Sequence, residues 1–420
     1  MKISKDLQKL NSHGYEVLLS SYLQELGKVG IGEFGLWRSP YTQEYEEAAN
    51  LVAGWMKEHG FEVKKDGIGN IIGRIEGTDN QARAVTMGSH LDTVRGGGIY
   101  DGMLGVAGGI IAAGYLLKTY GRPQNPIEVI AFIGEEGSRF SGLMGSKWMA
   151  GDLEEKELVK VDENGISLKA AAQAFGYSLS PSGSTPRSDV EAFLELHIEQ
   201  GPVLEAKGCP IGIVSGITGM RQAELTIRGR SDHAGTTPMG MRHDALLAAA
   251  KMIGAMDLCV RQSGGDTVFT VGRISANPGA VNVVAAETVF TIDMRDPDPK
   301  KLKGLYSQLE EETLKVAAQT GVLVEWKNIL AVEPVPCSPI LRDILAEAAR
   351  KAGLDYHEMV SGAGHDAIMA ARFAPIGMLF VPSTGGRSHC GEEYTSPSQC
   401  MAGVTVLAEA IRQLAYKNKY

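Results

Sequence analysis

Apolar and polar positions follow regular patterns along most of the chain, and these patterns predict alternating helices and strands. Apolar residues at helical spacing predict helices at 41–59, 103–117, 242–258, 299–320, 339–352 and 397–416. Apolar runs and strict alternation predict a hairpin at 61–75 and strands at 84–90, 127–134, 191–199, 221–228, 267–275, 288–293, 322–329 and 376–381. The segment 153–186 is polar and weakly periodic, which is typical of a surface excursion.

The order of these elements changes near Gly212. From there the chain runs strand, helix, strand, strand, helix, strand, which is the order of a ferredoxin-like unit. After Glu333-Pro334-Val335-Pro336 the α/β pattern resumes. We therefore predict an α/β domain at 1–212 and 330–420, built as a mixed sheet flanked by helices. A ferredoxin-like α+β domain at 213–329 is inserted into it.

Composition and charge exclude several classes of protein. A length of 420 residues is enough for two or three domains, and the net charge of −9 argues against a nucleic-acid-binding surface. Residues 1–6 lack the apolar core of a signal peptide, and the longest weakly polar run, 105–117, is too short to span a bilayer. The five cysteines show no paired spacing, which fits reduced thiols. We expect a cytoplasmic protein that binds neither a membrane nor nucleic acid.

One stretch, residues 88–102, combines an apolar strand, a Gly-rich loop and the start of a helix of small residues. His90 and Asp101 fall at the carboxyl end of that strand, where open α/β sheets place their chemistry. Imidazole and carboxylate both suit a divalent transition metal. Asp92 shares the strand face of His90, and its side chain is expected to accept the second ring N–H. For this stretch alone, a strand-end histidine capped by an aspartate explains the residues as well as a metal site does.

Ligand-type residues also stand at the ends of other predicted elements. The full set is His90, Asp101, Glu136, His197 and His389. Three histidines and two carboxylates suit two metals that share one carboxylate. Glu135 precedes Glu136 and points the opposite way on extended backbone, so it suits a general base for an attacking water. Taken singly, Glu135-Glu136 reads as an exposed acidic pair and His197 as a satisfied core histidine.

In sequence order, the motifs resemble those of a dinuclear-metal amidohydrolase family that includes aminoacylases and di- and tripeptidases. The matching stretches are GSHLDTV…GGIYDG, GEEGSRF…GS, ELHIEQG, DHAGTTPM, NVV…IDMRD, SGAGHDA and GGRSHC. They are most similar to the amidase branch, with N-carbamoyl-L-amino acid hydrolase, β-ureidopropionase and allantoate amidohydrolase. Two details favour this branch: only eleven positions separate His90 from Asp101, and a histidine, His197, takes the fourth ligand position.

The resemblance implies a zinc-exopeptidase-like catalytic domain with two divalent metal ions per subunit, Zn or else Mn, Co or Ni. Asp101 would bridge them, His90 and His197 would bind one ion, and Glu136 and His389 the other. Glu135 would be the base.

The resemblance also places six residues at substrate positions: Gln200, His233, Asn282, Arg295, Gly364 and His365. Arg295 suits a bidentate grip on a carboxylate, although a salt bridge to Asp293 or Asp296 explains it equally from sequence. His233 suits donation to a developing oxyanion, and its alternative is a surface-loop histidine.

One stretch departs from the family pattern Ser-His-Asn/Ser-Pro-x-Glu. Here the chain has His389-Cys390-Gly391-Glu392-Glu393. Cys390 has no evident base and is interpreted as a bystander. The departure leaves the loop beside the second metal, and the substrate, open.

The expected reaction is hydrolysis of an N-carbamoyl-L-amino acid to the amino acid, CO₂ and ammonia. Allantoate hydrolysis is the first alternative, and a peptidase or aminoacylase activity the second. A non-enzymatic binding protein is disfavoured because every expected ligand type is present. The expected partners are a small substrate with ureido and carboxylate groups and a second copy of the chain, which would pair through the inserted lid domain.

Overall fold

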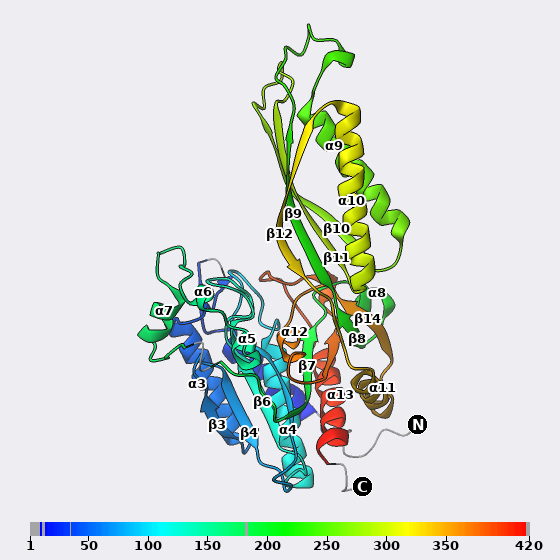
Figure 1. Ribbon diagram of the computed structural model, residues 1–420. Helices are drawn as coiled ribbons and strands as arrows, with labels where there is room; N and C mark the ends of the chain where they lie inside the picture. The colour runs from blue at the N-terminus through cyan, green and yellow to red at the C-terminus, as the bar shows by residue number, and fades with distance from the viewer. Residues whose placement is uncertain (1–8, 11–12, 34, 181–183, 417–420) are drawn as a thin grey trace. The chain divides into compact units, whose positions relative to one another are not determined.

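The computed structural model describes residues 9–10, 13–33, 35–180 and 184–416 (Figure 1). The stretch 1–6 considered above lies outside them. The chain divides into two compact units, the first formed by residues 1–215 with 337–420 and the second by residues 216–336. Each unit is described separately below.

A large mixed sheet forms the centre of the first unit. Its strands are β3 (Glu62–Lys65), β4 (Ile71–Ile75), β5 (Ala84–His90), β6 (Ile127–Phe132), β7 (Val190–Ile198), β8 (Ile211–Ile217), β13 (Val335–Pro336), β14 (Tyr356–Ser361) and β15 (Ile376–Val381). The strand order is β13-β8-β15-β7-β5-β6-β4-β3, and β14 pairs with β8. A separate small hairpin joins β1 (Ile31–Gly32) to β2 (Gly35–Leu36).

The four central strands, β15, β7, β5 and β6, are parallel to one another. Strands β5, β6 and β15 are buried at every position, as parallel strands covered on both faces should be. Because the strands are parallel, their carboxyl ends meet at one edge of the sheet. His90, His197 and the loops that follow β6 and β15 are therefore brought to the same edge.

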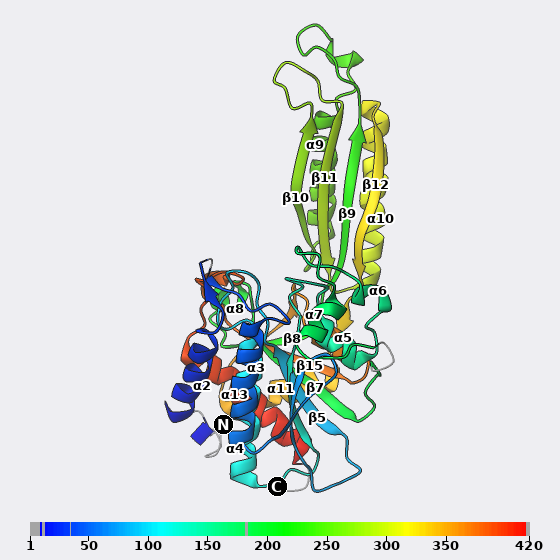
Figure 2. The ribbon, with the colours of Figure 1, turned by 90° about the vertical axis from the view of Figure 1, so that its left-hand side faces the viewer.

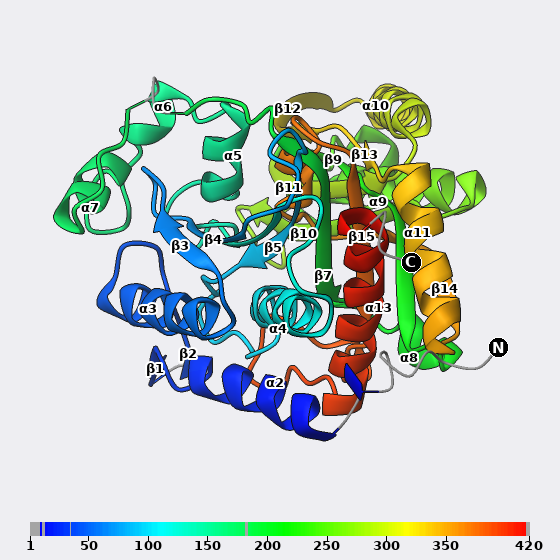
Figure 3. The ribbon, with the colours of Figure 1, turned by 90° about the horizontal axis from the view of Figure 1, so that it is seen from below.

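Helices cover both faces of this sheet. The unit contains α2 (His13–Leu26), α3 (Gln43–Glu58), α4 (Met103–Tyr120), α5 (Met144–Ala150), α6 (Glu155–Leu158), α7 (Leu168–Ala174), α8 (Val203–Lys207), α11 (Pro339–Ala352), α12 (Ala367–Ala370), the short 3₁₀ helix η3 (Thr384–Gly386) and α13 (Pro397–Ala415). One face of the sheet is covered by α3, α4, α11 and α13 (Figure 3). Helix α12 contacts β7 and β15, and α5 packs against α12. The prediction of a mixed α/β fold is confirmed. The sequence patterns missed α2, β8 and β14, and the polar excursion contains α6 and α7.

Helix α4 is the buried core helix of the unit. It is longer than the predicted helix and, by length and composition, could cross a membrane, but most of it is buried inside the fold. Burial, and not the shortness of its apolar run, therefore marks it as a core helix. Small residues allow this close packing: a Cβ on Gly105 would lie 2.4 Å from the carbonyl oxygen of Leu196.

The second unit is a four-stranded antiparallel sheet with two helices. Its elements in chain order are β9 (Gly219–Arg228), the short 3₁₀ helix η2 (Met239–Met241), α9 (Ala245–Ser263), β10 (Val268–Asn277), β11 (Glu287–Asp296), α10 (Pro299–Thr320) and β12 (Leu323–Val332). The strand order β10-β11-β9-β12 is that of a ferredoxin-like sheet (Figure 2). One core holds this unit together, with Leu225, Met252, Phe290 and Leu309 at its centre.

Candidate metal centre

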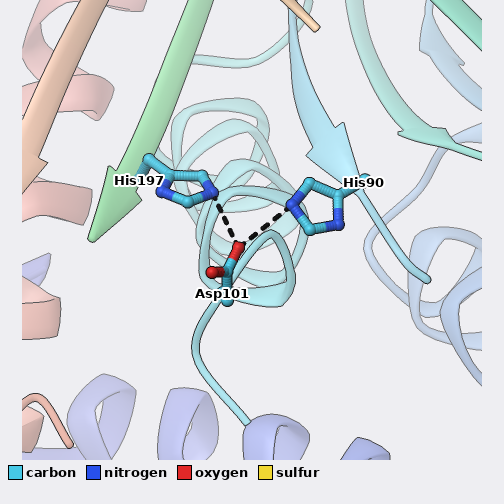
Figure 4. Close-up of side chains that lie close together, drawn as sticks. All are labelled: His90, Asp101 and His197. Atoms are coloured by element: carbon cyan, nitrogen blue, oxygen red, sulfur yellow. Dashed lines mark hydrogen bonds and ion pairs between the residues drawn. The ribbon is translucent and has the colours of Figure 1, made fainter. Parts of the chain in front are cut away.

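The carboxylate of Asp101 lies between two histidines at the carboxyl edge of the first unit's sheet (Figure 4). Its Oδ1 atom is 3.1 Å from Nε2 of His90 and 3.2 Å from Nε2 of His197. All three side chains are buried. Strands β5 and β7 supply the histidines. The loop that leads into α4 ends in Asp101-Gly102 and supplies the carboxylate. The loop between His90 and Asp101 was predicted to bring the two residues to the same edge of the sheet, and it does so.

The other oxygen of Asp101 faces a second group of ligand-type side chains. Its Oδ2 atom is 3.4 Å from Nε2 of His389, and that nitrogen is 3.5 Å from Oε2 of Glu136. Asp101 thus belongs to two groups of potential metal ligands, one with His90 and His197 and one with Glu136 and His389. This is the arrangement that one carboxylate shared by two ions requires.

Glu135 lies beside the first group as well. Its Oε2 atom is 4.0 Å from Nε2 of His90, and Glu135, Glu136 and His90 form a third group close enough to hold an ion. Distances alone therefore leave open which glutamate binds metal and which acts on a proton. The assignment of Glu136 as the ligand and Glu135 as the base remains a prediction, and substitution of each glutamate in turn tests it.

The ring nitrogens of the two buried histidines show that this arrangement suits a cation. Nδ1 of His90 is 2.9 Å from the backbone oxygen of Asp92, and Nδ1 of His197 is 2.9 Å from that of Ile198. A neutral imidazole that donates from Nδ1 turns the lone pair of Nε2 toward Asp101. Lone pairs of nitrogen and carboxylate oxygen repel unless a proton or a metal ion lies between them. The donor set of imidazoles and carboxylates fits a divalent transition metal.

Asp92 supports the site by a different atom from the one predicted. The backbone carbonyl of Asp92, and not its side chain, accepts from His90. The carboxylate instead accepts three backbone N–H groups, from Gly134 at 2.8 Å and from Glu135 and Glu136 at 3.1 Å. The prediction for the side chain was wrong because a strand pattern shows which face a residue occupies, not which loop folds over it. Asp92 fixes the glutamate loop.

Glycine is required at the turn that carries Asp101. Gly102 has φ of +70°, and a Cβ there would lie 2.5 Å from the ring atoms Cε1 and Nδ1 of His90. The backbone N–H of Gly102 also points to Nε2 of His197 at 3.2 Å. Any side chain at position 102 would displace the ring of His90, so the glycine allows the two ligand loops to meet.

Burial and neighbouring charges shift the acid–base properties of the carboxyl groups in opposite directions. Burial raises the pKa of Glu135 well above its usual range, and the carboxyl groups of Asp366 and Glu136 raise it further. Burial raises the pKa of Glu136 to about 7. Burial also disfavours the charge of Asp101, but the charge and hydrogen bond of His197, with those of the other histidines, hold its pKa well below the usual range. Asp101 thus stays anionic between the histidines.

Gln200 and His389 complete the rim of the site with unusual backbone conformations. Their φ angles are +60° and +56°, which non-glycine residues rarely adopt. The side-chain amide of Gln200 donates to Oδ2 of Asp101 at 2.7 Å and lies 3.4 Å from Nε2 of His389. The structure therefore brings the predicted substrate residue Gln200 into contact with the predicted ligands.

The remaining predicted substrate residues of this unit, Gly364 and His365, lie in the loop after β14. Gly364 is exposed, whereas His365 is 1 % exposed and its ring centre is 4.6 Å from that of His197. Nε2 of His365 pairs with the hydroxyl of Ser361 at 2.9 Å. His365 therefore packs against a predicted ligand, and its role as a substrate residue remains a prediction.

Three predicted substrate residues belong to the second unit. His233 forms a β-bridge with Val283, and the N–H of Ala234 donates to the carbonyl of Asn282 at 3.0 Å, so His233 and Asn282 lie on adjacent loops. Nδ1 of His233 accepts the N–H of Gly235 at 3.1 Å. This assignment leaves Nε2 of the exposed imidazole as a donor.

Arg295 lies on β11, near the opposite end of the strand from the loop of Asn282. Its guanidinium donates to both oxygens of Asp293, at 2.9 and 3.1 Å. The salt-bridge alternative for Arg295 is thus formed in the structure.

Sequence reasoning missed a buried carboxylate beneath the two histidines. Glu195 accepts from the hydroxyl of Ser89 at 2.8 Å and from the N–H of Ala367 at 3.0 Å. Ser89 precedes His90, and Glu195 shares the strand face of His197, so Glu195 ties both histidine strands to α12. The available signal was a glutamate in the middle of a strand that is otherwise buried.

Comparison with known proteins agrees with this geometry. A model of peptidase family M20/M25/M40 matches residues 86–413. An N-carbamoyl-L-amino-acid amidohydrolase of Paenarthrobacter aurescens is 39% identical over 93% of this chain and 96% of its own length. An allantoate amidohydrolase of Bacillus subtilis is 37% identical over 95% of this chain and 97% of its own. A solved structure, a hydantoinase/carbamoylase family amidase from Burkholderia multivorans, has a TM-score of 0.90 and 34% identity and covers 95% of this chain and 98% of its own.

The fold and the groups of ligand-type side chains define a hydrolase of a metal-dependent class. The chain belongs to peptidase family M20/M25/M40. The predicted family and the prediction of a hydrolase are confirmed. The family is metal-dependent, and the described residues include side-chain groups that can bind metal.

Proposed function

We propose that this protein hydrolyses the linear ureido C–N bond of an N-carbamoyl-L-amino acid, with two divalent metal ions held by Asp101, His90, His197, Glu136 and His389. The observation that carries the proposal is the position of Asp101 in both ligand groups, with Glu135 beside them. The named activities of the relatives support the substrate class. Hydrolysis would yield the amino acid, CO₂ and ammonia.

The chain's own residues divide the work of the reaction. Bound metals would supply Lewis acidity and lower the pKa of water. Glu135 takes the proton of the attacking water and passes it to the leaving nitrogen. Gln200 orients the substrate next to Asp101, Arg295 holds the substrate carboxylate, and His233 donates from Nε2 to the developing oxyanion. Asn282 and the backbone at Gly364 and His365 complete the substrate contacts.

Allantoate is the second candidate substrate. It also combines a carboxylate with ureido groups, and relatives that carry this name match the chain over most of its length. A substrate panel decides between the candidates: the purified protein, loaded with Mn²⁺ or Zn²⁺, is assayed for ammonia release from N-carbamoyl-L-amino acids, allantoate and dipeptides. Turnover of N-carbamoyl-L-amino acids above the others supports the proposal. Turnover of dipeptides alone would contradict it and identify a peptidase.

The geometry within the second unit favours a homodimer with shared active sites. Glu287 pairs with Arg228 at one end of the sheet, and Arg295 pairs with Met220 near the other. At roughly 3.4 Å per residue, Glu287 and Arg295 are about 27 Å apart, and the loops of His233 and Asn282 extend beyond the Glu287 end. One small ureido acid cannot reach both ends. We therefore assign His233 and Asn282 to the site of the partner subunit.

Such a dimer would form through the second unit. Its edge strands β10 and β12 expose apolar side chains, among them Val268, Ile274, Leu323 and Ile329, and unpaired edges need cover. A two-fold axis relates identical edges or helices in most homodimers. The same unit would close over the bound substrate as a lid, and we place this dimer in the cytoplasm.

Complementation tests the shared site. Glu135→Gln and His233→Ala subunits, each inactive alone, are mixed under conditions of verified subunit exchange. One site of each mixed dimer combines an intact Glu135 with an intact His233, so activity should recover to about half per mixed dimer. Mixing two batches of Glu135→Gln is the control and should recover nothing. No recovery in the verified heterodimer would show that His233 acts within its own subunit or has no role.

Substitution of Arg295 tests the carboxylate contact. Arg295→Ala should lower kcat/KM for an N-carbamoyl amino acid by an amount that corresponds to about 2–5 kcal/mol of lost transition-state stabilisation, the scale for a desolvated charge pair. The loss should be much smaller for the matching amide. The matched control is Arg273→Ala, which removes an exposed arginine of β10 that pairs with Glu224 of β9 across the intervening strand β11. Equal losses for acid and amide would make the Arg295–Asp293 pair structural.

A further inference from the structure

The buried side chain of Glu393 joins the two loops that carry the shared and the last ligand. Glu393 lies four positions after His389 and is 5 % exposed. Its Oε1 atom accepts the backbone N–H groups of Tyr100 and Asp101 at 2.9 and 3.1 Å. Its Oε2 atom is 2.8 Å from the hydroxyl of Ser388. One carboxyl group thus holds the backbone at Asp101 and the residue before His389.

The hydroxyl of Ser388 extends this connection to the ligand atom itself. Its Oγ atom is also 2.8 Å from Oδ2 of Asp101, the oxygen that faces His389. The loop at this point is strained, since His389 has a φ of +56°, and such a conformation persists only where neighbouring contacts hold it. Ser388, which contacts both Glu393 and Asp101, directly precedes that strained residue in the chain.

An independent observation at Gly98 shows that the loop is shaped around Glu393. A Cβ at position 98 would lie 2.2 Å from Oε1 of Glu393 and 2.5 Å from its Cβ. Gly98 has an ordinary φ, so its glycine is needed for the close approach of Glu393 and not for backbone freedom. The Gly-rich loop between His90 and Asp101 therefore leaves space for this side chain.

We infer that Glu393 is a positioning residue that fixes Asp101 and His389 relative to each other, and so sets the affinity of the second metal position. The inference rests on the proposed metal centre. A buried carboxylate is stable only with its hydrogen bonds formed, and all three partners of Glu393 belong to the two ligand loops. Loss of Glu393 would free both loops while leaving every predicted ligand in the chain.

Metal titration of full-length variants tests the inference. The variants are Glu393→Ala, Glu393→Gln and Gly98→Ala, the last of which displaces Glu393 without changing its chemistry. Glu392→Gln is the matched control, because its side chain is exposed and pairs with Arg387. Calorimetric titration of the chelated proteins with Mn²⁺ or Zn²⁺ should show one of two sites weakened by about 10–100-fold in Glu393→Ala and Gly98→Ala, the scale for lost outer contacts of a metal site. Glu393→Gln should lie between, and the control should match the unmodified protein.

Hydrogen exchange provides a readout without metal. The amides of Tyr100 and Asp101 donate to Glu393, so in the folded, metal-free Glu393→Ala protein they should exchange at least about tenfold faster than in the control. Unchanged metal affinity and unchanged exchange in all three variants would overturn the inference. Failure of the unmodified protein to bind metal would instead overturn the metal centre and the predicted affinity change, while the exchange rates would still report on the loop contact.

Discussion

Removal of the bound metals is expected to abolish hydrolysis, and Mn²⁺, Co²⁺, Ni²⁺ or Zn²⁺ is expected to restore it. The physical reason lies in the centre itself: Asp101 is held between His90 and His197 at 3.1 and 3.2 Å, and none of these groups is a strong nucleophile. A divalent metal ion held there would lower the pKa of water and make it reactive near neutral pH. The measurement is ammonia release before chelation, after chelation and after each metal is returned.

Elemental analysis is the control for metal removal. Chelation should also lower the melting temperature, because a ligand at 100 times its Kd stabilises the folded state by about 2.7 kcal/mol. His389→Ala should retain less metal than the unmodified protein, since it removes a proposed ligand of the second group. Full activity in a preparation shown to contain no metal would contradict the proposed centre.

The meeting of the ligand-type residues was predictable because parallel strands impose a simple geometry. His90 ends β5 and His197 lies at the end of β7, and the carboxyl ends of adjacent parallel strands lie at one edge of the sheet. A Gly-rich loop followed by a small-residue helix returns Asp101 to that edge. The spacing of apolar positions thus carries enough information to bring together residues from distant parts of the chain.

Individual hydrogen bonds were not predictable in the same way. Asp92 was expected to bind the ring of His90, but its carboxylate binds the loop of Glu135 and Glu136. The ring of His365 packs against that of His197, a contact that the sequence pattern did not indicate. Both outcomes depend on tertiary contacts between segments far apart in sequence. Periodicity gives the face of a strand, and several partners can lie on that face.

Glu393 illustrates the same limit within a motif. The family pattern Ser-His-Asn/Ser-Pro-x-Glu already contains a glutamate at this position. The chain departs from the pattern at Cys390 and Gly391, which draws attention away from Glu393. A Cβ on Gly391 would meet no atom within 4 Å, so the departure changes backbone freedom and does not create a packing gap. Glu393, which matches the family pattern, is the residue whose contacts hold the loop.

Glu135→Gln is expected to lower kcat by at least about 10²-fold, the scale for loss of a general base, with little change in metal content. Glutamine keeps the shape of the side chain but cannot take a proton from water. Burial and the carboxyl groups of Asp366 and Glu136 raise the pKa of Glu135, which makes it a stronger base than an exposed glutamate. Steady-state kinetics and elemental analysis of the same preparation measure both quantities.

Glu136→Gln provides the contrast for this prediction. Glu136 lies with Asp101 and His389 in one ligand group, so its substitution should reduce metal content toward one ion per subunit and lower activity through that loss. Added metal should restore part of the activity of Glu136→Gln and none of that of Glu135→Gln. If Glu135→Gln loses metal and Glu136→Gln retains it, the two roles are reversed, and Glu135 is the residue that completes the ligand group of His90.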